Sequence, residues 1–230
     1  MLNKLISGIS LITLCSNIVA QSPGQGLAYY QSFDAPQPEA IRMAEIATRD
    51  SSSLFLVHTS SYSEGLKGKA LDLTDEVAYR IPLSLTAKDC PSFDDGRSFS
   101  LQVWVKTKPG APLGTPIMTN ATTKEPTGWC IGTQENGAWY LSLNDGKNSY
   151  TYQPTAQRQA INDGKWHQLT VSVDKTKGEV WMYLDGRNVA IYQIEGLKSL
   201  ESKFRTIIGG SDEEQDWECR GEWMAFNGKI

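Results

Sequence analysis

The chain has 230 residues, 40% of them hydrophobic, which is enough for one sizeable core and indicates a single domain. Its formal net charge of -4 argues against the generally basic surface that binds nucleic acid. No nucleic-acid partner is therefore expected.

The N-terminal segment has the pattern of a secretory signal peptide. Lys4 precedes an apolar run over residues 5–14, and Ala20 supplies a small residue at the expected cleavage site. The apolar run is too short to span a bilayer. We therefore expect a signal peptide over residues 1–20 and a mature domain over residues 21–230. The product is expected to be secreted, periplasmic or on the cell surface, without a membrane span.

Cleavage at this point removes Cys15 and leaves Cys90, Cys130 and Cys219 in an oxidising compartment. One disulfide and one free thiol is the simplest arrangement of an odd number of cysteines. Because Cys90 lies beside Pro91 in an expected loop, we favour a disulfide between Cys130 and Cys219. The other two pairings stay open.

The first part of the mature chain is predicted to be mixed in structure. Residues 38–49 combine good helix formers with a proline in the first turn, which predicts a short helix. Residues 60–68 read as a loop. The two glycines at its end predict a sharp turn into a strand in which Ala70 and Leu71 pack inward.

Residues 98–107 are predicted to form the most regular strand. Alternate positions on one face carry the apolar residues Phe99, Leu101, Val103 and Val105. Gln102 and Trp104 lie on the opposite face. Further strands are predicted at residues 116–119, 128–132, 138–144 and 149–153. The dipeptides Asn136-Gly137 and Asp145-Gly146 are typical of tight hairpin turns between such strands.

Residues 164–186 predict a hairpin that continues into a third strand. Its two strands cover residues 168–174 and 179–185, and Asp185-Gly186 is typical of the tight turn that follows. In the second strand the alternation directs Val180, Met182 and Leu184 into the core. Trp181 and Tyr183 are therefore expected on the outside.

Several motifs follow one another in a characteristic order. They are Gly65-Leu-Lys-Gly-Lys-Ala-Leu-Asp-Leu73, the strand that begins at Ser98, Gly128-Trp-Cys-Ile-Gly132, Trp166-His167, Tyr183-Leu-Asp-Gly186, Ile207-Ile-Gly-Gly210 and residues 221–230. Together they resemble the laminin G-like domains of the concanavalin A-like lectin/glucanase superfamily, over about residues 65–230. The resemblance implies an all-β fold, a two-sheet antiparallel β-sandwich or jelly roll. It also implies that Trp166 and His167 are scaffold.

The resemblance has one departure, at the C-terminal end. Family members continue past the sequence F-N-G-K-I into a closing strand, whereas this sequence ends at Ile230. A sandwich without that strand exposes unpaired backbone groups. We therefore expect the domain to be the N-terminal accessory part of a larger extracellular protein, with a downstream domain as one of its partners.

One segment has the spacing of a catalytic motif. Glu214, Asp216 and Glu218 match the E-x-D-x-E pattern of laminarinase-type glucan hydrolases, in which a strand places three carboxylates on one face. The surrounding run is polar and lacks apolar alternate residues, which favours a solvated loop. We therefore assign no catalytic residue and do not expect an enzyme, with the glucan hydrolase kept as an alternative.

Calcium is the one cofactor that the resemblance raises, because laminin G-like domains often bind Ca²⁺ at the sandwich rim. Asp212 and Asp216 are weak candidate ligands, and Asp94, Asp95 and Glu213 are further oxygen donors. None of them has a diagnostic spacing. No metal site is therefore predicted, and Ca²⁺ stays open.

The outward aromatic residues are the most promising functional signal. Aromatic rings stack on the apolar face of a sugar, and neighbouring amides and hydroxyls orient it, so Gln102, Trp104, Trp181 and Tyr183 are the candidate ligand-binding residues. The alternative is that these aromatics are packed under another element. Trp129, Trp139 and Trp223 are expected in the core. The leading prediction is a non-catalytic module that recognises a glycan or an extracellular protein; a purely structural domain is a further alternative.

Overall fold

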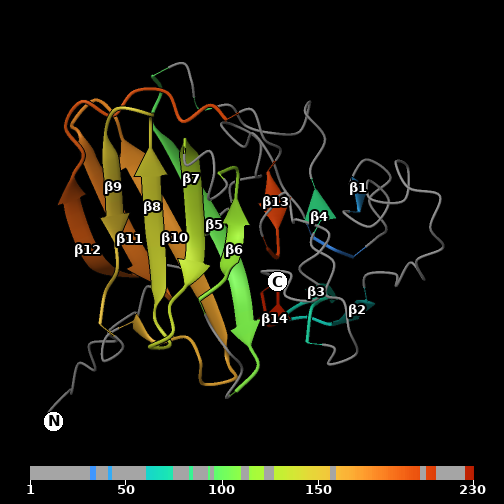
Figure 1. The fold of residues 1–230 in the computed structure, drawn as a ribbon. Coiled ribbons are helices and arrows are strands. Elements are labelled where there is room, and N and C mark those ends of the chain that lie inside the picture. Colours follow the sequence, from blue (N-terminus) through green and yellow to red (C-terminus); the bar gives the residue numbers. More distant parts are fainter. Residues whose placement is uncertain are drawn as a thin grey trace, which may run out of the picture. The chain divides into compact units, whose positions relative to one another are not determined.

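The structure is a computed structural model whose described residues form fourteen strands in two antiparallel seven-stranded sheets (Figure 1). It describes residues 32–34, 41–42, 61–74, 83–84, 93, 96–109, 114–121, 127–155, 159–202, 206–210 and 226–230. All of them belong to the unit formed by residues 31–230. The predicted two-sheet antiparallel sandwich is confirmed.

The two sheets have different strand orders. Sheet A runs β1 (Ile41–Arg42), β4 (Leu83–Ser84), β13 (Ile207–Ile208), β6 (Pro116–Thr119), β7 (Gly128–Thr133), β8 (Trp139–Asn144), β9 (Ser149–Tyr152). Sheet B runs β12 (Arg187–Gln193), β11 (Glu179–Leu184), β10 (Trp166–Asp174), β5 (Phe99–Thr107), β14 (Gly228–Lys229), β3 (Lys69–Asp72), β2 (Ser61–Glu64). In Figure 1, β7, β8 and β9 lie in front of the β10–β12 layer.

The core lies between the sheets and follows from the alternation of apolar residues along each strand. Sheet B contributes Leu101, Val103, Val105, Leu169, Val171, Val173, Val180 and Met182, all of them buried. Sheet A contributes Ile117, Trp129, Ile131, Trp139, Leu141 and Leu143. Burial of each such side chain contributes about 1.5–3 kcal/mol relative to exposure. The prediction that Trp129 and Trp139 are core residues is confirmed.

The hairpins turn where the sequence predicts. Gly137 and Gly146 have φ angles of 88° and 84°, in the left-handed region that favours glycine. Asp185 and Gly186 have φ angles of 52° and 75°, as a type I′ turn requires. The turns fix the register of β7 with β8 and of β11 with β12, and hence which side chains face outward.

Two predictions about the N-terminal part are wrong. Ile41 and Arg42 form β1, which pairs with Leu83 and Ser84, so the helix predicted over residues 38–49 does not form at these two positions. The rest of that range lies outside the described residues. Ser61–Glu64 forms β2 instead of loop, and pairs with β3. Both strands are short and lack apolar alternation, so pairing with a neighbour, and not local propensity, determines their structure.

The last residues of the chain lie inside sheet B. Gly228 and Lys229 pair with β5, Lys229 also pairs with Asp72 of β3, and Leu71 and Ile230 exchange two backbone hydrogen bonds of 2.9 and 3.0 Å. A closing strand and a downstream domain beyond this point stay predictions. In the described part of the chain, no helix has the length and apolar character needed to cross a bilayer.

Candidate functional site

The predicted ligand-binding residues lie on the side of sheet B that faces away from sheet A. On β5, Gln102 and Trp104 alternate with buried residues, and the Trp104 side chain is 38% exposed. On β11, Trp181 and Tyr183 alternate with buried Val180 and Met182 and are half-buried. Strand β10 lies between them and contributes Gln168, Thr170 and Ser172. We call this set of seven residues, Gln102, Trp104, Gln168, Thr170, Ser172, Trp181 and Tyr183, the outer face.

Strand register arranges the outer face in rows that run across the three strands. Gln102 lies opposite Thr170, and Thr170 lies opposite Tyr183, so these three residues form the central row. Trp104 lies opposite Gln168 at one end of the face, and Trp181 lies opposite Ser172 at the other. The face therefore has an aromatic residue at each end and hydroxyl and amide groups between them.

The two tryptophans are too far apart to hold one sugar ring. Strands about 4.8 Å apart and a rise of about 3.4 Å per residue place the Cα atoms of Trp104 and Trp181 roughly 17 Å from each other. Sequence alternation assigned them to one face but did not give this separation. A ligand that uses both must extend over several sugar units along the face.

Hydrogen bonds hold the end of the face near Trp181. The Trp181 indole Nε1 donates to Glu179 Oε2 at 3.2 Å, which orients the ring along β11. Ser100 donates to the Ser172 hydroxyl at 3.1 Å and links β5 to β10. Such fixed side chains lose little entropy when a ligand binds.

Trp166, which was expected to be scaffold, lies on the outward side of sheet B. The structure pairs Trp166 with Lys106, two residues from the pair of Gln168 with Trp104, so it is the diagonal neighbour of Trp104 on the outward side. Its side chain is half-buried. The period of two from Trp166 through Gln168 and Thr170 is the signal that could have identified it.

His167 lies at the start of β10 and is held by two carboxylates. Its Nδ1 is 2.9 Å from Asp185 Oδ2, and its Nε2 is 3.0 Å from Asp163 Oδ1, with 13% of the side chain exposed. Burial lowers the pKa of His167, but the hydrogen bonds and charges of Asp185 and Asp163 outweigh it, so the pKa is raised. Asp185 also accepts a hydrogen bond from the Gln168 amide. The imidazolium therefore joins the start of β10 to the β11–β12 turn.

The stability of the protein is expected to fall as pH rises, through His167. Because the folded-state pKa is raised, its contribution is fully present below the ordinary value of 6.5 and is lost as pH rises through the raised pKa. We expect wild type to lose up to about 1 kcal/mol of unfolding free energy across this window, the scale of a solvent-screened ion pair. Urea unfolding at pH 6 and pH 9 measures it. His167→Gln should be less stable at pH 6 and flat in this window; an equal slope in both proteins would contradict the assignment.

Cys130 is a free thiol in the structure, buried with its Sγ 3.2 Å from the Tyr140 hydroxyl. Burial raises its pKa, so it is a poor nucleophile. Its expected partner Cys219 lies outside the described residues, as does Cys90. The predicted disulfide therefore stays a prediction.

The acidic candidates all fall outside the part of the chain that the structure describes. Glu214, Asp216 and Glu218 of the hydrolase pattern lie outside the described residues, and so do Asp212, Asp94, Asp95, Glu213 and Trp223. Among the residues that the structure does describe, no group of three His, Cys, Asp or Glu side chains is arranged to hold a metal ion. Calcium binding at Asp212 and Asp216 stays untested.

Known proteins are similar to this chain in sequence or in structure. A non-toxic nonhemagglutinin from Paraclostridium bifermentans is 23% identical over 118 residues, which are 50% of this chain and 10% of that protein. The binding domain of Paraclostridial Mosquitocidal Protein 1 is similar in structure, with a TM-score of 0.51, 15% identity and coverage of 67% of this chain and 38% of that chain. Domains LG4-5 of the mouse laminin α1 chain give a TM-score of 0.50, 17% identity and coverage of 79% and 44%.

The extent of these similarities limits what they establish about this chain. The chain spans about a tenth of the length of the curated relative that it matches. At such identities the structural likeness establishes the fold alone. The family match is more extensive: residues 84–230 match the Laminin G 3 family, described as the concanavalin A-like lectin/glucanases superfamily. The predicted resemblance is confirmed, and the chain belongs to this superfamily.

Proposed function

We propose that the protein is a non-catalytic carbohydrate-binding module that holds an extended glycan on the outer face of sheet B. The observation that carries the proposal is the strand register. It places Trp104 at one end of the face and Trp181 at the other, with Gln102, Thr170 and Tyr183 in a row between them. Membership of a superfamily that includes lectins supports it.

The chemistry of the face suits a sugar chain. An aromatic ring stacks on the apolar C–H face of a sugar, and amide and hydroxyl groups hydrogen-bond the sugar hydroxyls. Trp104 keeps 38% of its surface exposed. This argues against the alternative in which the aromatic residues only fill a second packed layer.

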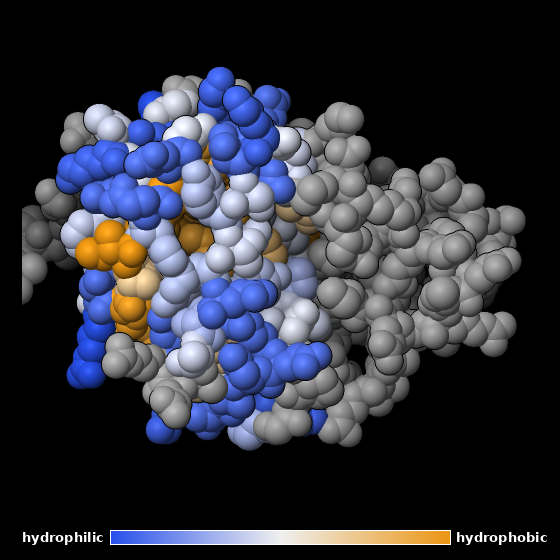
Figure 2. Space-filling model, turned by 60° about the vertical axis from the view of Figure 1, so that its left-hand side comes forward, coloured by the Kyte–Doolittle hydropathy of each residue, from blue (hydrophilic) through white to orange (hydrophobic). Residues whose placement is uncertain are grey.

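A glycan fits this surface better than a protein partner does. A protein interface has a contiguous, desolvated apolar centre. The large apolar side chains exposed in the described part of the chain are Leu66, Trp104 and Ile191, at 54%, 38% and 49%. They lie on a turn, on β5 and on β12. On the side of the molecule that Figure 2 shows, where the β9 and β12 edge comes forward and the outer face is turned away, orange atoms form small groups among blue and white.

Secretion and attachment to a larger protein belong to the same proposal. Binding of an extracellular glycan agrees with the signal pattern of residues 1–20. The coverage of only 10% of the curated relative supports a role as an accessory domain of a longer extracellular protein. The reading frame after Ile230 tests this, because a stop codon there with a stable product would contradict it. The glucan hydrolase alternative depends on Glu214, Asp216 and Glu218, which lie outside the described residues, and incubation with a β-glucan tests it.

A glycan array tests the proposal. Wild-type protein should bind a set of oligosaccharides, and Thr170→Arg should lower the signal because a long charged side chain then covers the central row. The matched control is Thr151→Arg, at an exposed position of β9 in sheet A. Equal loss of signal in both variants, or no binding by wild type, would contradict the proposal. Selective binding of wild type to an extracellular protein with a blank array would favour the protein-partner alternative.

A further inference from the structure

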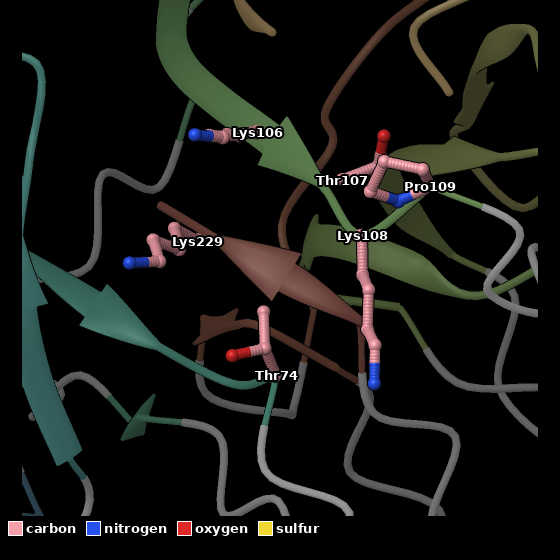
Figure 3. A pocket seen from close by; sticks show the side chains of 6 residues that line it. All are labelled: Thr74, Lys106, Thr107, Lys108, Pro109 and Lys229. Carbon is pink, nitrogen blue, oxygen red and sulfur yellow. The ribbon is translucent and has the colours of Figure 1, made fainter. Parts of the chain in front are cut away.

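A small pocket lies at the Trp104 end of the outer face. It has a volume of about 240 Å³ and is lined by Thr74, Lys106, Thr107, Lys108, Pro109 and Lys229 (Figure 3). Three segments distant in sequence meet here: the end of β5, the residue pair that forms β14, and the residue that follows Leu73 after β3. The lining residues contribute three ammonium groups and no carboxylate.

Two of the lysines lie directly opposite each other. Lys106 and Lys229 are register partners on β5 and β14, and Figure 3 shows their ammonium groups directed to the same side, whereas Lys108 extends another way. Like charges at directly opposite positions of a sheet are destabilising. An anion placed between these two side chains would relieve that repulsion.

A network orders one lysine of this pair. The Lys229 ammonium is 3.3 Å from Asp72 Oδ2 and donates to the Ser63 hydroxyl at 2.7 Å. Burial raises the pKa of Asp72, but hydrogen bonds from Ser63, Thr74 and Lys229 outweigh it and lower the pKa to about 2. Asp72 is therefore a carboxylate at neutral pH, and it fixes Lys229 while balancing one positive charge of the pocket.

The pocket continues the outer face. Lys106 follows Trp104 by two residues on the same side of β5, a distance of about 7 Å along the strand. Trp166 of β10 is the register partner of Lys106. A sugar ring stacked on Trp104 or Trp166 would therefore direct a substituent of its ring toward the ammonium group of Lys106.

We propose that this pocket binds the acidic group of an anionic glycan, a carboxylate or a sulfate. The inference rests on the proposed glycan-binding function and adds the class of ligand to it. Lys106 neutralises the anion, Lys229 lies opposite Lys106 with its charge balanced by Asp72, and Trp104 stacks on the sugar that carries the acidic group. This basic pocket lies on a chain whose net charge is -4, so it is a local feature and not a general property of the surface.

Calorimetric titrations with three hexasaccharides test the inference: a polyuronate, a sulfated galactan and neutral laminarihexaose. We expect at least one of the acidic ligands to bind more tightly than the neutral one, and the stronger of the two identifies the acidic group. Lys106→Gln should weaken binding of that ligand about fivefold, the scale of a partly screened charge contact, and leave neutral binding unchanged. Raising ionic strength from about 0.1 to about 1 M should weaken only acidic binding.

This test has its own control variant, and the outcomes that contradict the anionic pocket differ from those that contradict glycan binding. Lys147→Gln removes an exposed lysine from the β8–β9 turn and should leave every affinity unchanged. Lys106 is partly exposed, so its substitution should not disturb folding, and circular dichroism checks this. If wild type binds laminarihexaose at least as tightly as the acidic ligands, or if Lys106→Gln changes nothing, the anionic pocket is wrong and glycan binding stands. If none of the three binds, the anionic pocket is wrong, and the glycan array decides the proposed function separately.

Discussion

Replacing Asn120 by alanine is expected to lower the free energy of unfolding by about 3 kcal/mol. Asn120 is 5% exposed, its Oδ1 accepts from the Trp129 amide at 2.7 Å, and its Nδ2 donates to the Leu200 carbonyl at 3.1 Å. Alanine leaves both backbone groups buried without a partner, and each such group costs about 1–3 kcal/mol. Asn120 thereby joins β7 to the segment that precedes β13.

Urea unfolding followed by circular dichroism measures this loss. The matched control is Asn144→Ala, because Asn144 also caps a backbone amide, that of Gly146, but at an exposed hydrogen bond. The control should cost less than about 1 kcal/mol. Equal effects of the two substitutions would contradict the role of Asn120. The triplet Asn120-Ala121-Thr122 also fits the pattern of an N-glycosylation acceptor, but the enclosed amide makes glycosylation incompatible with this folded structure.

Replacing Trp104 by alanine is expected to weaken glycan binding tenfold or more. A stacked aromatic side chain contributes about 1.5–3 kcal/mol through the apolar surface that it buries, and each 1.4 kcal/mol is about a factor of ten in Kd. Trp104 is 38% exposed in the free protein, and this exposed part is the surface that a sugar can cover. The buried part contributes to folding, so circular dichroism checks that the variant keeps its fold. Titration calorimetry with the strongest ligand from the array measures the change.

Two further variants give this prediction its controls. Trp104→Tyr keeps an aromatic ring at the same position and should retain most of the affinity. Leu66→Ser removes the most exposed apolar side chain of the described residues, on the turn between β2 and β3, and should have no effect. If Trp104→Ala binds as wild type does while Leu66→Ser is impaired, the ligand binds elsewhere on the molecule.

Much of the sandwich follows from local patterns. The alternation from Phe99 to Thr107 predicts both the strand β5 and which of its residues are buried, because a strand between two layers must present one apolar face. Asp185-Gly186 predicts the turn that positions β12 beside β11. These features depend on residues close in sequence, and such interactions can be read from the sequence directly.

Other features depend on residues far apart in sequence. β2 has no apolar alternation because it is an edge strand, and its pairing with β3 is what makes it a strand. The separation of Trp104 from Trp181 depends on the insertion of β10 between β5 and β11. The pocket combines Lys106 with Lys229, which are distant in the chain. No periodicity within a single segment contains this information.

A titration followed by the indole N–H resonances in two-dimensional ¹H–¹⁵N NMR tests the central claim most directly. It monitors the tryptophans of the outer face and those of the core in one experiment, with the acidic or neutral hexasaccharide that binds best as ligand. We predict saturable shifts of the Trp104 and Trp181 resonances, while Trp129 and Trp139, which are buried between the sheets, stay in place. Binding of the glycan without any change at Trp104 and Trp181 would contradict the assignment of the outer face as the binding site.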